Sequence, residues 1–89
     1  SIEYSNKLAQ RVIDDVGEDV PLQIALAWQL TFAKPSSEEE LAEASSFVYA
    51  QRTLIAKADQ KLKAEDVARE ALGVFCQALL SSSRFLYVD

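Results

Sequence analysis

Carboxylates are the side chains in this sequence that could do chemistry, and they form two clusters. Paired carboxylates can act as general acid and general base, and several carboxylate oxygens together can bind calcium. The first cluster lacks the Asp-x-Asp-x-Asp-Gly spacing of an EF-hand loop, which favours a solvated turn between helices. The second follows two serines, as acids at a helix start do. The clusters are Asp14, Asp15, Glu18 and Asp19, and Glu38, Glu39, Glu40 and Glu43.

Histidine and methionine are absent, and Cys76 is the only cysteine. A c-type haem needs a Cys-x-x-Cys-His attachment, structural zinc needs several cysteine or histidine ligands, and a serine or cysteine nucleophile needs an imidazole base. We therefore predict that this chain has no catalytic residue, no metal site and no cofactor of its own. Cys76 is predicted to be an inert buried thiol on the inner face of its helix.

The composition is that of a single folded domain. The chain has 89 residues, of which 49% are hydrophobic, and it has two glycines and two prolines; disordered chains show the opposite balance. The net charge of −5 argues against nucleic-acid binding, because phosphate backbones repel an acidic chain. No apolar run approaches the roughly 18 residues that span a bilayer, and Ser1 leads into an amphipathic pattern rather than a signal peptide.

Four amphipathic segments are predicted to be helices, at about residues 2–16, 20–33, 37–58 and 64–82. Apolar residues keep a helical period in these segments, and no segment reads convincingly as a strand. Helices with one apolar stripe must pack together to bury it. The predicted fold class is therefore all-α, a compact antiparallel bundle of about four helices with an ordered apolar C-terminal segment.

Local signals predict where these helices begin and end. Gly17 is suited to a left-handed C-cap after the first helix. Asp19 can cap the second helix, with Pro21 in its first turn. Ser36 and Ser37 each have a glutamate three residues later, the pattern of a capping box at the start of the third helix.

The helix at 20–33 is apolar around most of its circumference, which predicts a central position in the bundle. Trp28 on this helix is therefore interpreted as a core residue rather than a ligand-stacking one. Tyr49 is expected to be half-buried, with its hydroxyl reaching solvent or a backbone carbonyl. Gly73, inside the fourth helix, would allow a neighbouring helix to approach closely.

The chain ends with four large apolar residues before Asp89. Chain ends are usually polar and frayed, whereas burying each such side chain contributes roughly 1.5–3 kcal/mol. We therefore predict that this segment packs into the bundle. Together with Trp28 and Tyr49, its members are the candidate packing and interaction residues: Phe85, Leu86, Tyr87 and Val88.

The C-terminal sequence CQALLSSSRFLYVD resembles the closing signature of a family of large planctomycete proteins, which end in a domain of unknown function (fifteen-fifty-three, also called the planctomycete PSD-one domain). The phrases EYSNKLAQRV and QIALAWQLTFAKPSSEEELAEASSF are similar to earlier parts of that domain. The chain departs from the family pattern at Ala33-Lys34-Pro35, where a glycine-arginine-proline turn is commoner, and at Ser81 to Ser83, where asparagine is common.

This resemblance implies a context rather than a reaction. Such proteins are exported or envelope-associated, and many carry a cytochrome-c-like domain near the N-terminus. Residues 1–89 would then form a single helical domain, the C-terminal part of a larger protein, with haem elsewhere in the parent polypeptide. The absence of Met and of a signal peptide agrees with this expectation.

We therefore expect a non-catalytic helical module that packs against other domains of its own polypeptide. Two alternatives stay open: the chain contributes one wall of an active site whose reactive groups lie upstream, or it is a free-standing helical adaptor. No residue pattern specifies an oligomeric state.

Deletion of Phe85 to Asp89 is expected to lower the thermal midpoint by roughly several degrees, because their side chains would fill the bundle. Thermal unfolding followed by circular dichroism measures this. An unchanged midpoint would show that the segment does not pack within the domain.

Overall fold

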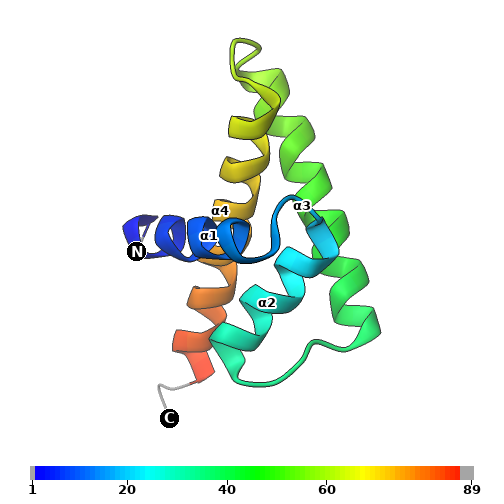
Figure 1. The fold of residues 1–89 in the computed structure, drawn as a ribbon, viewed down its shortest axis with the longest axis vertical. Coiled ribbons are helices and arrows are strands. Elements are labelled where there is room, and N and C mark those ends of the chain that lie inside the picture. The colour runs from blue at the N-terminus through cyan, green and yellow to red at the C-terminus, as the bar shows by residue number, and fades with distance from the viewer. Residues whose placement is uncertain (1, 87–89) are drawn as a thin grey trace.

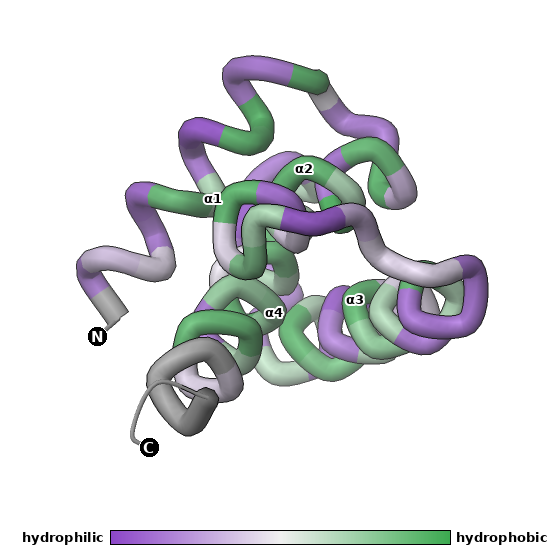
Figure 2. Tube along the Cα trace, turned by 90° about the horizontal axis from the view of Figure 1, so that it is seen from below, coloured by the Kyte–Doolittle hydropathy of each residue, from purple (hydrophilic) through white to green (hydrophobic). Residues whose placement is uncertain are grey.

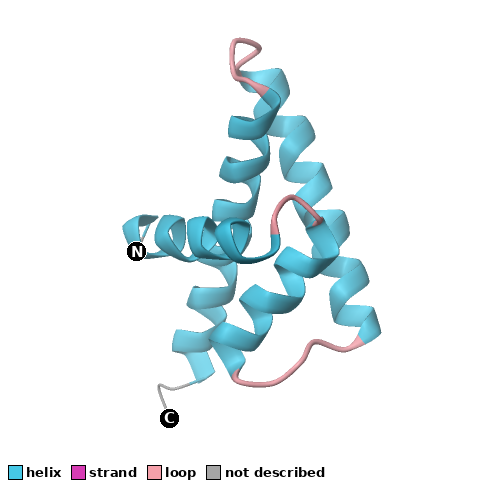
Figure 3. Cartoon of the chain, viewed as in Figure 1, coloured by secondary structure: helices cyan, strands magenta, loops and turns pink. Residues whose placement is uncertain are grey.

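The computed structural model describes residues 2–86, with side chains described for residues 3–82, and this part of the chain forms four helices joined by short connections (Figure 3). They are α1 (Ile2–Val16), α2 (Val20–Phe32), α3 (Glu38–Ala58) and α4 (Ala64–Leu86). Within these residues there is no strand. The prediction of an all-α helical bundle is confirmed.

The longest helices, α3 and α4, run side by side in opposite directions along the 42 Å axis of the molecule (Figure 1). Seen from below, α1 and α2 lie on one side of this pair (Figure 2). Helix α1 runs across α4 rather than along it, whereas α2 lies against both α3 and α4 (Figure 1). The result is a two-layer arrangement in which α4 contacts each of the other helices.

The predicted helix starts are confirmed by their capping bonds. The Asp19 carboxylate accepts a hydrogen bond from the Leu22 backbone N–H at 3.1 Å. Ser37 is the N-cap of α3: its hydroxyl accepts from the Glu40 N–H at 3.0 Å, and the Glu40 carboxylate accepts from the Ser37 N–H at 2.8 Å. These reciprocal bonds satisfy backbone donors that the helix itself cannot pair.

The predicted end of α4 is wrong, because the helix continues from the expected boundary near residue 82 to Leu86. The three serines lower helix propensity only modestly, and neither Gly nor Pro follows them to stop the helix. Phe85 and Leu86 are thus helical in backbone. Their side chains, together with all of Tyr87 and Val88, lie outside the described residues, so packing of the apolar segment stays a prediction.

The interior is apolar and draws on all four helices. Helix α1 lies close to Gly73 of α4, as expected from the glycine. A Cβ atom built at Gly73 would lie 2.9 Å from Asn6 Oδ1. A side chain at this position would therefore displace Asn6 where α1 crosses α4. The main buried cluster consists of Ala9, Val12, Val20, Ile24, Ala27, Ala44, Val48, Ala71, Leu72, Phe75, Cys76 and Leu79.

The central position predicted for α2 is only partly realised. Val20, Ile24 and Ala27 are buried, but Leu22 is 53% exposed and Leu30 is 37% exposed. Trp28 packs against the core cluster while remaining half-buried. An apolar helix in a small domain thus keeps part of its surface uncovered by the described residues.

The residues that follow α1 and α2, Gly17 and Ala33, both have a left-handed backbone conformation. Reverse substitutions at these two positions test that conformation. Gly17 (φ +78°) donates its N–H to the Ile13 carbonyl, and Ala33 (φ 58°) donates to the Gln29 carbonyl, each at 2.8 Å. Because a Cβ atom disfavours this conformation, Gly17→Ala is expected to reduce the free energy of unfolding by about 1 kcal/mol, and Ala33→Gly to increase it by about 1 kcal/mol.

Urea denaturation of the two variants measures both changes. A general effect of glycine content acts through the unfolded chain and has the reverse signs, because it stabilises Gly17→Ala and destabilises Ala33→Gly. An increase in the free energy of unfolding for Gly17→Ala, or a decrease for Ala33→Gly, would contradict the assigned backbone conformations.

Candidate functional site

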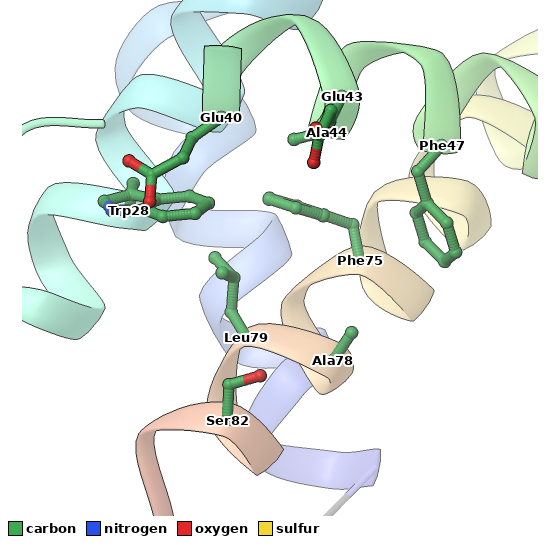
Figure 4. Close-up of a pocket in the computed structure, with 9 residues that line it drawn as sticks. All are labelled: Trp28, Glu40, Glu43, Ala44, Phe47, Phe75, Ala78, Leu79 and Ser82. Carbon is green, nitrogen blue, oxygen red and sulfur yellow. The ribbon is translucent and has the colours of Figure 1, made fainter. Parts of the chain in front are cut away.

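An open apolar hollow of about 490 Å³ lies among α2, α3 and α4, and we call it the Trp28 groove (Figure 4). Its size falls within the range of small-ligand and peptide-anchor sites. Most of its lining atoms belong to aromatic and aliphatic side chains, with carboxylates and one hydroxyl among them. The lining residues are Trp28, Glu40, Glu43, Ala44, Phe47, Phe75, Ala78, Leu79 and Ser82.

Helical geometry explains why these residues share one hollow. The α3 residues stand at positions 40, 43, 44 and 47, and the α4 residues at 75, 78, 79 and 82. Both rows follow the i, i+3, i+4, i+7 spacing of a single helix face. Because α3 and α4 are antiparallel, the two rows form opposite walls, and Trp28 from α2 contributes a third side (Figure 4).

Small residues in the walls leave the space that the groove occupies. Ala44 lies in the α3 row and Ala78 in the α4 row, where larger side chains would meet across the gap. The aromatic rings of Phe47 and Phe75 contact each other across the helices, with centroids 6.5 Å apart and planes tilted by 51°. Phe75 is buried, whereas Phe47 is 37% exposed.

Trp28 contributes a large, partly exposed indole to the groove. Its ring packs on Phe32 with the centroids 5.2 Å apart. The indole Nε1 atom is buried and has no hydrogen-bond partner among the described residues. Buried indole N–H groups usually find an acceptor.

The polar side of the groove is acidic. Glu40 and Glu43 both come from α3, and none of the described lining residues is basic. The Glu40 side chain points toward the side of the hollow that Trp28 lines (Figure 4), and one of its carboxylate oxygens accepts the capping bond from the Ser37 N–H. Glu43 is exposed, and among the described residues no hydrogen bond or ion pair involves its carboxylate.

The residues predicted from the sequence to be interaction sites are not all brought together. Trp28 lines the groove, but Tyr49 lies outside it, 51% exposed, with the Arg52 guanidinium carbon 5.5 Å from its ring centre. The side chains of the remaining candidates, Phe85, Leu86, Tyr87 and Val88, lie outside the described residues.

Several members of the acidic clusters form bonds within the domain. Asp19 caps α2, Asp14 accepts a 2.9 Å hydrogen bond from Gln10, and Asp15 lies 3.8 Å from Arg11. Within the described part of the chain, no group of three or more acidic or cysteine side chains is arranged to hold a metal ion. The calcium alternative therefore has no geometric support.

A second hollow, of about 380 Å³, has mixed polarity. Its walls include Glu18, Glu65, Arg52 and Arg69, two charges of each sign. Gln23 also lines this hollow. Its side-chain N–H donates a hydrogen bond to the Gly17 carbonyl at 2.7 Å, which ties α2 to the connection that precedes it. Arg69 is already paired with Asp66 at 2.6 Å. Balanced charges give this hollow no preference for either an anion or a cation.

Cys76 is fully buried, as predicted. Removal from water disfavours the thiolate and raises the pKa of Cys76 from 9.0 to about 12. Because the thiolate is the nucleophilic form, this cysteine is poorly suited to covalent catalysis.

The described helices include none with both the length and the apolar character needed to cross a bilayer. Comparisons with known protein families, curated proteins and solved structures find no match to the chain.

Burial of Cys76 predicts a specific loss of stability at alkaline pH. The unfolded thiol loses its proton near its ordinary pKa of 9.0, whereas the folded thiol keeps it up to about 12. Rising pH therefore favours the unfolded state, and between about pH 8 and about pH 10 the wild type should lose roughly 1 kcal/mol more stability than Cys76→Ala.

Urea titrations of both proteins across this pH range measure the difference. The alanine variant starts from a lower stability because it leaves a small cavity, so the slopes are compared rather than the absolute values. Parallel slopes would contradict the burial of the thiol.

Proposed function

We propose that this chain is a non-catalytic helical module that packs against other parts of its own polypeptide, with the Trp28 groove on its docking face. The observation that carries the proposal is an apolar groove lined by half-exposed aromatic side chains on an otherwise small, rigidly capped bundle. Partly exposed aromatic rings around an apolar hollow are typical of the anchor pockets that a partner fills.

The uncovered side of α2 supports the same function. This helix combines a very apolar sequence with exposed Leu22 and Leu30, and it also supplies Trp28 to the groove. Each large aliphatic side chain left in water forgoes roughly 1.5–3 kcal/mol of burial energy. Packing against another domain would recover part of that energy.

The resemblance to the planctomycete domain of unknown function supplies the proposed context, an exported or envelope-associated protein linked to a cytochrome-c-like domain. The backbone at Ala33 supports the resemblance, because the family pattern more often has glycine there and φ is 58° at this residue. Any haem would belong to another part of the parent polypeptide.

A second candidate function, one wall of an active site, is favoured by a specific arrangement. The groove brings the exposed Glu43 carboxylate to the same hollow as Trp28. A lone carboxylate can act as a general base or acid only if reacting groups come from elsewhere. The docking function needs no such contribution, and for that reason it is preferred. The third possibility, a free-standing adaptor, would use the same groove for another protein.

Hydrogen exchange in two polypeptides tests the proposal: the 89-residue chain, and a longer chain that continues upstream of Ser1. Docking is expected to slow amide exchange in α2 and in the first half of α3, whereas the α3–α4 turn, outside the groove, serves as the internal control. Identical exchange in both polypeptides would contradict docking.

The same longer chain also distinguishes the active-site wall from the docking module. Glu43→Gln preserves the size of the side chain and removes its charge. Loss of a measurable activity in this variant, with the exchange protection of α2 unchanged, would favour the active-site wall over the docking module.

A further inference from the structure

We propose that the segment which fills the Trp28 groove is an amphipathic helix whose apolar side chains face the groove and whose flanking lysine or arginine side chains lie along α3. This inference rests on the proposed docking function and adds the chemistry of the partner. Its basis is the pairing of an apolar floor with a wall whose charged members, among the described residues, are both acidic.

The shape of the groove suits a helix. Its two walls are antiparallel helix faces, each built from residues at i, i+3, i+4 and i+7. Side chains of a third helix can enter the space left between such rows, as ridges pack into grooves in helix-in-groove recognition. The half-exposed Phe47 and Trp28 rings provide the large contact surface that central anchors in interfaces usually have.

The acidic residues of the groove favour basic side chains on either side of the partner's apolar face. Among the described residues that line it, Glu40 and Glu43 are charged. A neutral apolar partner would remove water from these carboxylates without replacing the lost interactions, and an acidic partner would add repulsion. A lysine or arginine on the partner would offset the loss of water at these carboxylates.

The same charges argue against a second copy of this chain as the occupant. In a two-fold symmetric dimer through the groove, Glu40 and Glu43 would face the same patch of the other copy. The surrounding half of the chain strengthens this effect, since residues 1–50 contain nine acidic and three basic residues, a net charge of −6.

Binding of matched model peptides to the intact chain tests the inference. The probe is a leucine, alanine and lysine peptide of about four helical turns, patterned with one apolar face. Its twin carries glutamate in place of every lysine, and a third peptide has the lysine sequence scrambled to remove the apolar face. Trp28 is the only tryptophan, so its fluorescence reports directly on the groove.

The lysine peptide is expected to bind at least about fivefold more tightly than the glutamate twin and the scrambled peptide, with affinity falling as salt is raised. Glu43→Lys should remove most of this preference, whereas Glu70→Lys, an equal charge change on an exposed α4 residue outside the groove, should retain it. Phe47→Ala should weaken binding, whereas Leu54→Ala, which truncates a 60% exposed side chain on the same helix, should not.

Equal binding of the lysine and glutamate peptides, or no binding of either, would overturn the inference. So would sedimentation showing a dimer that Glu43→Lys disrupts, because a second copy would then fill the groove.

If α2 is protected in the longer polypeptide but the lysine peptide does not bind, docking stands and the partner chemistry is wrong. If the peptide binds but α2 is not protected, the groove serves a separate partner, and docking within the polypeptide fails instead.

Discussion

The apolar face of α4 is the surface on which the other three helices are packed. Leu72 and Cys76 are completely buried at its centre, and Ala71, Phe75 and Leu79 extend the same face. Helices α1 and α3 each pack mainly on α4, so their positions relative to each other depend largely on this one stripe, whereas α2 also contacts α1 and α3. The chain has a small core for four helices, and no disulfide can reinforce it. Close packing on α4 therefore has to provide the order that larger domains obtain from several independent layers.

Local chemistry was sufficient to predict the helix boundaries where a cap exists. The Asp19 cap, the Ser37–Glu40 capping box and the left-handed Gly17 each depend on residues within a few positions of one another. Where no stop signal exists the prediction failed, because α4 passes through the serines to Leu86. The two-layer arrangement, with α1 across α4, depends on how helix surfaces fit and is not visible in the periodicity of any one segment.

The groove shows the same limit more clearly. Its residues are ordinary members of two helix faces, and the hollow arises only when α3 and α4 are set antiparallel with Ala44 and Ala78 in the facing rows. The all-round apolar pattern of α2 predicted a central helix, and the structure realises that position only in part. Hydrophobicity along a sequence does not record which neighbour covers each side chain, so the exposure of Leu22 and Leu30 could not be predicted. Tyr49, a candidate from its type alone, lies outside the groove.

Glu40 belongs both to the cap of α3 and to the wall of the groove. One carboxylate oxygen accepts the hydrogen bond from the Ser37 N–H, while the side chain lines the same hollow as Trp28 (Figure 4). Occupancy of the groove and fraying of the first turn of α3 are therefore thermodynamically linked through a single side chain. A cation that holds the Glu40 carboxylate in place would tighten the helix start, and one that pulls it away would open the loop joining α2 to α3. The connection between α2 and α3 would thus respond to whatever occupies the groove beside it.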